Sequence, residues 1–600
     1  MTEQEAIAYI ENYGWSATRL GLGRTRELLA GLGNPQKKLK FIHVAGSNGK
    51  GSACAMFDAV LRAAGYRTGL YTSPYIQRFN ERIRVNGMDI PGSRLAKLTE
   101  RVMQVAEKMD DHPSQFELVT GLALLYYYEE KCDIVVLEVG MGGALDSTNA
   151  IDAPELAVIT NIGLEHTEYL GSTLQEIAET KAGIIKPGCS CVCYDGAPEA
   201  TEVVRRICEE LEVPLTCSDF SGLIPLDCSL YGQRFLWKDA EYRLSLPGPH
   251  QLHNAALVLT GIEALRKHGW RIPDSAVHSG LENVSWPARL EVLSREPVFI
   301  LDGGHNPQCA EALACSLDLL LPGRQVIFLA GVLADKEYDL IMKMLLPYAK
   351  EFICVTPDNP RKLTGRELAD YLTGLGAEAS ACDSIEEGVL TALQRSGGSV
   401  PVVTFGSLYL AGTVRTCFHR QYRSWLRKRC IAARDALTPG ERQAFSETIC
   451  RRIADSDAFR NAETVMVYRS VRGEVSLDPL LRHSDASGKR FCFPLCAGTE
   501  LMPMIPGGWK AGAFGIPEPD PETSEKISPE EIGLVICPGT VFDARCSRIG
   551  MGGGFYDRFL PACKNAVIVM AAFEVQKASR IPADEWDFPM DAVYTEEMIY

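Results

Sequence analysis

The sequence lacks any long hydrophobic run and any surplus of positive charge. No stretch approaches the roughly twenty apolar residues that a membrane-spanning helix needs, and the N-terminal MTEQEAIAYI has no signal-peptide pattern. Lys and Arg number 61 against 77 Asp and Glu, for a formal charge of -16. This balance argues against nucleic acid or an anionic membrane as the main partner. It does not exclude small anionic substrates, because a single site can be locally basic. We therefore expect a cytoplasmic protein.

A complete zinc-finger motif, in which a Cys pair has a companion Cys or His pair at the required spacing, is also lacking. The 20 cysteines are scattered, and the run CSCVC at residues 189–193 has no companion Cys or His pair. Alternate cysteines in an apolar run share one face of a strand, where a thiol behaves as a small hydrophobic group. We predict reduced thiols in the core or at the surface, with metal binding a distant alternative.

What the chain does contain is enough material for several ordinary α/β domains. Its 600 residues exceed what one hydrophobic core organises, and 46% hydrophobic and 23% charged residues are typical of soluble globular proteins. We expect three or four domains rather than one.

A glycine-rich loop follows a short apolar run near the start of the chain. The run FIHVA, at residues 41–45, is apolar and partly β-branched, which predicts a buried strand. After the loop GSNGKGS, Phe57, Val60 and Leu61 fall on one face of a predicted helix. Strand, glycine loop and helix in this order form the context that a phosphate-binding loop requires. A chance glycine turn is the alternative.

Each residue type in this loop suits a nucleotide. Gly46, Gly49 and Gly51 allow the backbone to wrap closely and to aim N–H groups at phosphate oxygens. Lys50 is expected to reach the terminal phosphates, and the Ser52 hydroxyl to face a phosphate or Mg²⁺.

The loop HVAGSNGKGS resembles the signature of folylpolyglutamate synthase and dihydrofolate synthase, within the Mur-ligase superfamily. Further stretches match in order up to about residue 420, among them TSPYIQRFNERI, VVLEVGMGGALDSTN, ETKAGIIK, LPGPHQLHNAAL, WPARLEVL and LDGGHNP. The resemblance implies that ATP phosphorylates a folate carboxylate and that the amine of L-glutamate displaces the phosphate. Two departures from the family are Ser47, where Thr is commoner, and Ala144, where relatives often carry Arg.

The same resemblance assigns roles to individual residues. It implies that Lys50, His166 and Lys181 are catalytic, and that ATP binds at Gly46, Asn48, Gly49, Lys50, Gly51, Ser52, Asn254, Arg289, Asp302 and His305. It implies two Mg²⁺ ions, with ligands Ser73, Glu138, His166 and a carbamylated Lys181. Ser73 and Glu138 follow strand-like runs, whose ends deliver side chains to a shared cleft. An isolated Lys181 would otherwise be a surface lysine on an amphipathic helix.

The substrate pocket is the least specific part of this assignment. The resemblance implies a folate pocket lined by Phe116, Glu117, Thr120 and Asp146. The first three residues are equally compatible with the start of the apolar helix LVTGLALLYYY. A cell-wall Mur ligase is the rival on this fold, but it needs a separate domain before the phosphate loop, and only roughly 45 residues precede the loop here.

The last third of the chain resembles 5-formyltetrahydrofolate cyclo-ligase. Strand-like VMVY, FCFP, LVICP and AVIVM predict another α/β unit, and the stretches LRKRCIAARDALTPGER, FGIPEP and CPGTVFDARCSRIGMGGGFYDRFL carry the resemblance. It implies that Glu474 is catalytic and binds folate, and that Asp557 and Asp591 hold Mg²⁺. It also implies that ATP binds at Arg423, Arg427, Arg548, Gly550, Gly552, Gly553, Gly554 and Tyr556. Arg423 is often Lys in relatives, and Gly553 is Lys in some of them.

The sequence therefore predicts an α/β protein of three parts. These are a Mur-ligase-type phosphate-loop ATPase domain at residues 1–290, a smaller Rossmann-like α/β domain at 291–420 and a separate α/β cyclo-ligase domain at 421–600. We expect a bifunctional enzyme that uses folates, L-glutamate, ATP and Mg²⁺, and neither nucleic acid nor membrane. Two alternatives stay open: a first half that extends glutamate chains without accepting dihydropteroate, and a C-terminal unit that only binds folate or ATP.

Overall fold

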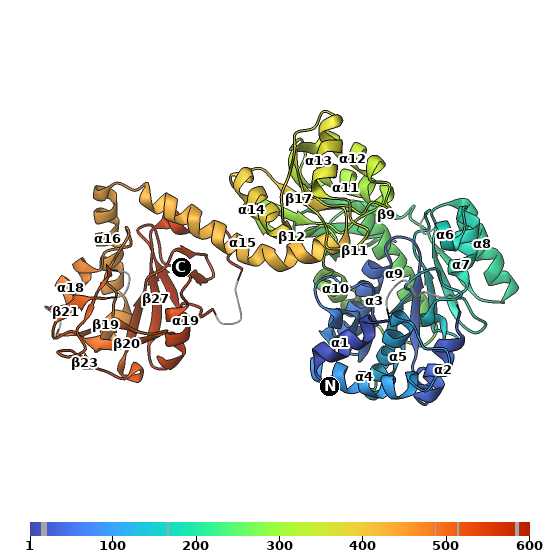
Figure 1. Ribbon diagram of the computed structural model, residues 1–600, viewed down its shortest axis with the longest axis horizontal. Coiled ribbons are helices and arrows are strands. Elements are labelled where there is room, and N and C mark those ends of the chain that lie inside the picture. Colours follow the sequence, from blue (N-terminus) through green and yellow to red (C-terminus); the bar gives the residue numbers. More distant parts are fainter. Residues whose placement is uncertain (14–20, 165–166, 486–487, 513–514, 583–586) are drawn as a thin grey trace. The chain divides into compact units, whose positions relative to one another are not determined.

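The computed structural model describes residues 1–600 except 14–20, 165–166, 486–487, 513–514 and 583–586 (Figure 1). The chain forms two compact units. Unit 1 comprises Met1–Leu293, Ile300–Gly388 and Pro401–Thr416, and unit 2 comprises Ser294–Phe299, Val389–Val400 and Cys417–Tyr600. The finer division into three domains, with boundaries at 290 and 420, stays a prediction.

Unit 1 is built on an eight-stranded sheet in the order β4-β3-β2-β5-β1-β6-β7-β8. Its strands are β1 (Phe41–Ala45), β2 (Thr68–Tyr71), β3 (Ile83–Val85), β4 (Met88–Asp89), β5 (Ile134–Glu138), β6 (Leu156–Ile159), β7 (Ser190–Tyr194) and β8 (Leu215–Ser218). The six strands from β2 to β8 in this order are parallel, and β3 and β4 add an antiparallel hairpin at one edge. The apolar run FIHVA is β1, as predicted.

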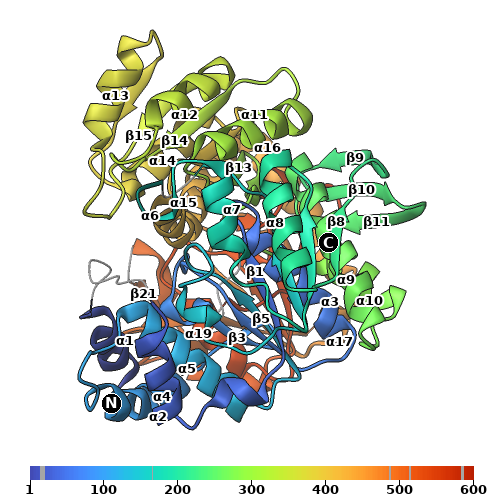
Figure 2. The ribbon, with the colours of Figure 1, turned by 90° about the vertical axis from the view of Figure 1, so that its right-hand side faces the viewer.

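Helices cover both faces of this sheet because both faces of its strands are apolar. The helices in this first part of unit 1 are α1 (Glu3–Glu11), α2 (Gly23–Gly31), α3 (Lys50–Ala63), α4 (Gly92–Ala106), α5 (Gln115–Glu129), α6 (Thr167–Leu170), α7 (Leu174–Ala182), α8 (Pro198–Glu210), α9 (Pro249–Lys267) and α10 (Asp274–Asn283). Ile42 and Val44 of β1 pack with Phe57 of α3 and with α9. Phe41, which points the other way, packs with α4 and α5. α7 and α8 lie next to each other and cover a third cluster, which includes Cys191 and Cys193 (Figure 2).

A second sheet has six strands in the order β12-β13-β17-β14-β15-β16. They are β12 (Glu291–Arg295), β13 (Val298–Leu301), β14 (Val326–Ala330), β15 (Ala349–Cys354), β16 (Ala379–Ala381) and β17 (Val402–Phe405), with helices α11 (Pro307–Leu320), α12 (Tyr338–Leu345), α13 (Gly365–Gly374) and α14 (Ile385–Ser396). A small antiparallel sheet of β9 (Leu223–Ser229), β10 (Gly232–Trp237) and β11 (Ala240–Leu244) precedes α9. α15 (Leu408–Asp435) begins in unit 1 and ends in unit 2.

Unit 2 has its own sheet, in the order β23-β20-β19-β18-β24-β27-β28. Its strands are β18 (Thr464–Met466), β19 (Arg490–Ala497), β20 (Glu500–Ile505), β23 (Glu525–Lys526), β24 (Leu534–Cys537), β27 (Val567–Ala571) and β28 (Ala592–Tyr594), with hairpins β21 (Trp509–Ala511)–β22 (Pro517–Pro519) and β25 (Val541–Phe542)–β26 (Arg548–Ile549). Its other helices are α16 (Pro439–Ala454), α17 (Asp457–Asn461), α18 (Asp478–Asp485) and α19 (Phe555–Phe559). Thr438 caps α16 and Pro439 opens it, a start signal visible in the sequence.

Two expectations about the whole chain can be compared with these elements. The α/β fold class is confirmed by the mixed sheets and their covering helices. All 20 cysteines are free thiols, and most of them are buried. Within the described residues, no helix combines the length and the apolarity that crossing a membrane requires.

Candidate active sites

The predicted phosphate loop lies between β1 and α3 and is fixed to the end of β6. Thr160 Oγ1 donates to the carbonyl of Asn48 at 2.8 Å. Gly46 has a φ of 146°, and a Cβ there would lie 1.8 Å from Thr160 Oγ1, so this position requires glycine. α3 begins at Lys50 without a side-chain cap, which leaves its first-turn N–H groups available to an anion.

Two lysine side chains converge on this loop. Lys50 Nζ donates to the carbonyl of Gly46 at 2.7 Å and to that of Ser47 at 3.0 Å. Lys181, on α7, is 1% exposed and donates to the same Gly46 carbonyl at 2.9 Å. Two positive charges therefore meet where the resemblance places the nucleotide phosphates. His166, predicted as their neighbour, lies outside the described residues.

Glu138 ends β5, directly beside the strand that leads into the loop. It is the Cα partner of Val44 in β1, and its Oε2 accepts from the backbone N–H of Ser73 at 3.0 Å. Burial raises the pKa of Glu138 to about 7, and the nearby Lys50 charge opposes this effect. A desolvated carboxylate of this kind is best satisfied by a cation.

The donor set here suits a hard cation. Among the residues that the structure describes, no group of three or more His, Cys, Asp and Glu side chains is arranged to hold a metal ion. The predicted set is of another kind, because it combines Ser73, Glu138, a modified Lys181 and His166. The oxygen donors of Ser73 and Glu138 fit Mg²⁺, which prefers oxygen and keeps several waters.

α9 places a polar pair against the loop and the start of α3. Asn254 Nδ2 donates to Gln251 Oε1 at 3.0 Å, and Gln251 Nε2 donates to Ser52 Oγ at 3.2 Å. A Cβ at Gly49 would lie 2.5 Å from Asn254 Oδ1, so Asn254 and the loop are brought together as predicted. Gln251 was not predicted, although the quoted stretch LPGPHQLHNAAL contains it.

The segment after β13 meets the phosphate loop from the other side. Asn306 Nδ2 donates to Asn48 Oδ1 at 3.1 Å, and Asn48 Nδ2 donates to Gln308 Oε1 at 2.6 Å. Asp302 is buried, which raises its pKa against the opposing charge of Arg289. Arg289 donates to the carbonyl of Ala288, and His305 is half-buried beside Gly303. Asn306 and Gln308 were not predicted, although Asn306 belongs to the motif LDGGHNP.

Of the four predicted folate-pocket residues, Glu117 is directed elsewhere. Its carboxylate accepts from the backbone N–H of Ser114 at 2.7 Å and from Arg24 Nε at 3.1 Å. It thereby forms the capping box of α5 and ties α5 to α2. These contacts support a structural role for Glu117. This is the alternative that the sequence left open, in which Glu117 belongs to the start of an apolar helix.

The other three residues lie around the ends of β2 and β5. Thr120 Oγ1 is 2.8 Å from Ser147 Oγ and 3.2 Å from the Tyr71 hydroxyl. Asp146 accepts from the backbone N–H of Met141 at 2.9 Å. A Cβ at Gly140 would lie 2.4 Å from the Phe116 ring and 3.1 Å from Asp146 Oδ2. These side chains therefore share one small region.

A buried arginine faces the same region and was missed by the sequence analysis. Arg82 is 5% exposed, and within the described residues its Nε and Nη1 have no hydrogen-bond partner. Its guanidinium lies 5.7 Å from the ring centres of Tyr75 and Phe79 and 6.0 Å from that of Phe116. An incompletely paired buried charge is costly, so the site calls for an anionic ligand. Arg82 stands in the quoted stretch TSPYIQRFNERI, which was its only signal.

In unit 2 the second glycine loop follows β26. Arg548 is 4% exposed and donates through Nη2 to Asp557 Oδ1 at 2.8 Å. Arg427 Nε, from α15, donates to the carbonyl of Gly550 at 2.9 Å. Gly552 and Gly554 have φ values of 110° and 64°, which favour glycine. Gly553 lies in this loop and Tyr556 in the first turn of α19, and the Arg548 guanidinium lies 5.6 Å from the Tyr556 ring centre.

Two other predicted residues of unit 2 lie apart from this loop or are otherwise engaged. Arg423 donates through Nη2 to Asp587 Oδ1 at 2.9 Å and through Nη1 to the Pro582 carbonyl at 2.8 Å. Asp591 accepts from the backbone N–H of Ile568 at 2.7 Å, at the amino-terminal end of β27. The loop lies at the opposite, carboxyl end of the parallel strands, because Arg548 donates to the carbonyl of Pro538, just after β24. The structure does not bring Asp591 to Asp557.

Glu474 is half-buried in a positively charged environment. Burial raises the pKa of Glu474, while Arg434 and Arg472 oppose the rise. Arg434 is 1% exposed and donates to the Arg472 carbonyl at 2.8 Å. Its Nε and Nη1 have no hydrogen-bond partner in the described part of the chain. Arg434 was not predicted, and its position in the run LRKRCIAARD gives no signal beyond helical spacing.

Comparison with protein families identifies the class of protein to which this architecture belongs. Residues 44–261 match the Mur ligase middle domain, and residues 288–408 match the Mur ligase, glutamate ligase domain. Residues 419–596 match the 5-formyltetrahydrofolate cyclo-ligase family. The chain is thus a Mur-type ligase with an added cyclo-ligase domain, as the sequence analysis predicted.

Individual relatives narrow the class further. The dihydrofolate synthase/folylpolyglutamate synthase of Bacillus subtilis is 36% identical over 424 residues, which cover 69% of this chain and 98% of the relative. The folylpolyglutamate synthase of Lacticaseibacillus casei is 35% identical over 437 residues, with the same shares covered. An Escherichia coli FolC structure in complex with DHPP and ADP is 28% identical, with a TM-score of 0.62, and the match covers 70% of this chain and 99% of that chain. The chain belongs to the folylpolyglutamate synthase/dihydrofolate synthase family.

Proposed function

We propose that unit 1 catalyses the ATP-dependent ligation of L-glutamate to tetrahydrofolate and to dihydropteroate. The observation that carries this proposal is the meeting of Lys50, Lys181 and the buried Glu138 at the phosphate loop. In the proposed reaction the γ-phosphoryl group of ATP passes to a substrate carboxylate, and ADP leaves. The amine of glutamate then attacks the carbonyl carbon, and the C–O bond to phosphate breaks to give an amide and inorganic phosphate.

The side chains have separate tasks in this proposal. Lys50 neutralises charge that develops on the transferred phosphoryl group, and the amides of the loop hold the phosphates of ATP. Arg82 binds a substrate carboxylate, which supplies the partner that its buried nitrogens lack. Ser73 and Glu138 would hold Mg²⁺, which supplies charge neutralisation on the nucleotide when bound. Carbamylation of Lys181 would add oxygen donors beside the phosphate loop, because this side chain is buried against the Gly46 carbonyl.

Initial rates of glutamate-dependent ADP formation test this proposal. The full chain is expected to turn over with tetrahydrofolate and with dihydropteroate, and the Lys50→Ala variant is the matched control. Turnover with tetrahydrofolate alone would favour the narrower alternative of a polyglutamate synthase. No glutamate-dependent turnover with either acceptor would contradict the proposal.

We further propose that unit 2 converts 5-formyltetrahydrofolate to 5,10-methenyltetrahydrofolate with ATP. The membership of residues 419–596 in the cyclo-ligase family and the Arg548–Asp557 pair in the glycine loop support this proposal. The formyl oxygen takes the γ-phosphoryl group, N10 attacks the formyl carbon, and phosphate leaves as the ring closes. Arg427 and Arg548 bind phosphates, Asp557 would hold Mg²⁺, and Glu474 binds the folate. We leave Asp591 out of this site because of its position.

Absorbance of the methenyl product tests the second activity. The full chain is expected to form this product with ATP and Mg²⁺, and Glu474→Gln to weaken folate use while ATP binding is retained. A chain that binds 5-formyltetrahydrofolate and ATP but forms no product would instead favour the alternative of a binding module. In both proposed reactions ATP phosphorylates an oxygen of a folate, and a nitrogen nucleophile then displaces the phosphate. The two activities would therefore act on the same class of substrate.

A further inference from the structure

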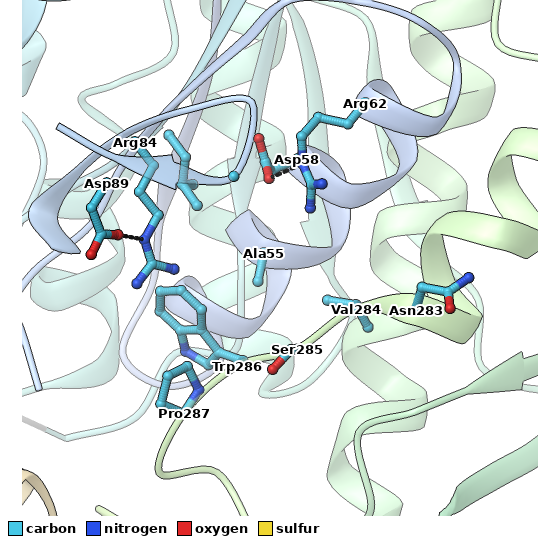
Figure 3. A pocket seen from close by; sticks show the side chains of 12 residues that line it. Ala55, Asp58, Arg62, Arg84, Asp89, Asn283, Val284, Ser285, Trp286 and Pro287 are labelled. Atoms are coloured by element: carbon cyan, nitrogen blue, oxygen red, sulfur yellow. Dashed lines mark hydrogen bonds and ion pairs between the residues drawn. The ribbon is translucent and has the colours of Figure 1, made fainter. Parts of the chain in front are cut away.

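A cavity of about 310 Å³ lies beside α3 and is lined by residues from four segments (Figure 3). α3, β2, the β3–β4 hairpin and the segment after α10 form its walls. None of residues 46–52 lines it, so it is separate from the phosphate loop. Its volume is at the lower end of the roughly 300–1,000 Å³ that small-molecule sites occupy. A small metabolite fits this space better than a nucleotide does.

Two arginines line the cavity with only part of their hydrogen-bonding capacity used. Arg62 Nε donates to Asp58 Oδ2 at 2.8 Å, and Arg84 Nε donates to Asp89 Oδ1 at 2.8 Å. Neither arginine makes a hydrogen bond through its terminal Nη atoms to any residue in the described part of the chain. Figure 3 shows the free ends of both guanidinium groups directed toward the middle of the pocket.

Both guanidinium groups are held in place before any ligand arrives. Asp58 is 3% exposed and also accepts from Thr68 Oγ1 at 2.5 Å, so the carboxylate that holds Arg62 is itself fixed. Arg84 and Asp89 are directly opposite each other in the β3–β4 hairpin. Preorganised donors lose little conformational entropy on binding, which favours a ligand that carries several oxygens.

An aromatic wall stands next to the two arginines. The Arg84 guanidinium lies 5.8 Å from the ring centre of Trp286. A Cβ on Gly51 would lie 2.9 Å from the other edge of this indole, so Trp286 separates the cavity from the phosphate loop. The indole and the methyl group of Ala55 offer apolar surface to the carbon skeleton of a ligand.

We propose that this cavity is a ligand site for a small organic anion, whose carboxylate or phosphate oxygens bind to Arg62 and Arg84. The planar fork of a guanidinium matches two oxygens of either group, so the two arginines together accommodate a dianion. Asp58 and Asp89 stay paired through the Nε atoms and orient the forks. The site is distinct from both proposed catalytic sites, because it shares no residue with either.

Calorimetric titration of the full chain tests the proposal. Saturating ADP first occupies the α- and β-phosphate positions of the two proposed nucleotide sites, and the cavity variants below distinguish binding in the cavity from phosphate binding at the remaining γ-phosphate position. Inorganic phosphate and malonate are then titrated separately, which distinguishes a phosphate from a carboxylate ligand. We expect at least one of the two probes to bind to the wild type. We expect the double variant Arg62→Gln/Arg84→Gln to bind the same probe about tenfold more weakly or worse.

Two further variants keep the test decisive. Ala55→Leu fills the cavity without altering a charge, and it is expected to abolish the same binding. This variant therefore tests the proposal if the double variant fails to fold. Arg206→Gln removes an exposed arginine that is also paired with acidic side chains, and it is expected to bind the probe like the wild type. If neither inorganic phosphate nor malonate binds at concentrations up to about 10 mM, the proposal is overturned. Undiminished binding in Ala55→Leu would overturn it as well.

Discussion

Replacing Glu138 by glutamine tests two effects of its buried carboxylate: the loss of folding stability that burying the charge causes, and the proposed binding of Mg²⁺. Burial raises the pKa of Glu138 from its ordinary value of 4.5 to about 7. The folded protein therefore holds this proton more tightly than the unfolded chain does. As the pH rises from 4.5 toward 7, the unfolded chain loses the proton first, and the wild type loses stability. Above about pH 7 the full cost is present.

The interval between the two pKa values sets the size of the effect. It corresponds to about 3 kcal/mol in the free energy of unfolding. Glutamine has the shape of the protonated acid and never ionises, so the variant is free of this cost. We expect Glu138→Gln to be more stable than the wild type by about 3 kcal/mol near pH 8.5 and by less than about 1 kcal/mol near pH 5. Glutamate ligation is expected to fall in the same variant, because a neutral amide is a poorer ligand for Mg²⁺.

Hydrogen exchange of peptides from β1 and β5 measures this difference in unit 1 alone, which matters because two compact units need not unfold together. Glu209→Gln, an exposed carboxylate on α8, is the matched control and is expected to show no such pH dependence. Added Mg²⁺ is expected to protect the wild type more than Glu138→Gln. A stability difference that stays constant from about pH 5 to about pH 8.5 would refute the reasoning about the buried carboxylate.

Three other changes test separate parts of the proposals. Lys50→Ala should lower glutamate ligation by about two to three orders of magnitude, while the cyclisation rate stays unchanged; a parallel loss of both activities in a folded protein would argue against two sites. Lys181→Ala should lose ligation and regain part of it with a short carboxylic acid, and a fully active enzyme whose intact mass shows an unmodified amine would exclude the carbamate. Arg82→Gln should raise the KM for the folate or glutamate substrate more than it lowers kcat, whereas unchanged kinetics would remove Arg82 from the substrate site.

The sequence alone determined the local elements that carry the chemistry. The apolar run FIHVA, the glycine-rich loop GSNGKGS and the helically spaced apolar residues after it predicted β1, the loop and α3, because these signals act over neighbouring residues. The ordered motifs also identified both families, which the comparisons confirm. Asn254 was assigned to the ATP site from its motif, and the structure places it beside the phosphate loop.

Only the tertiary structure decided which partners a side chain meets when those partners come from distant segments of the chain. Glu117 caps its own helix and binds Arg24, since the placement of α2 decides which partner its carboxylate meets. Asp591 directly precedes β28 and lies beside the amino-terminal end of β27, because these two strands are parallel neighbours. That pairing depends on the order of strands in the sheet, which periodicity along the chain does not encode. Arg82 became a candidate through its burial and its unused nitrogens, which are properties of packing between distant segments.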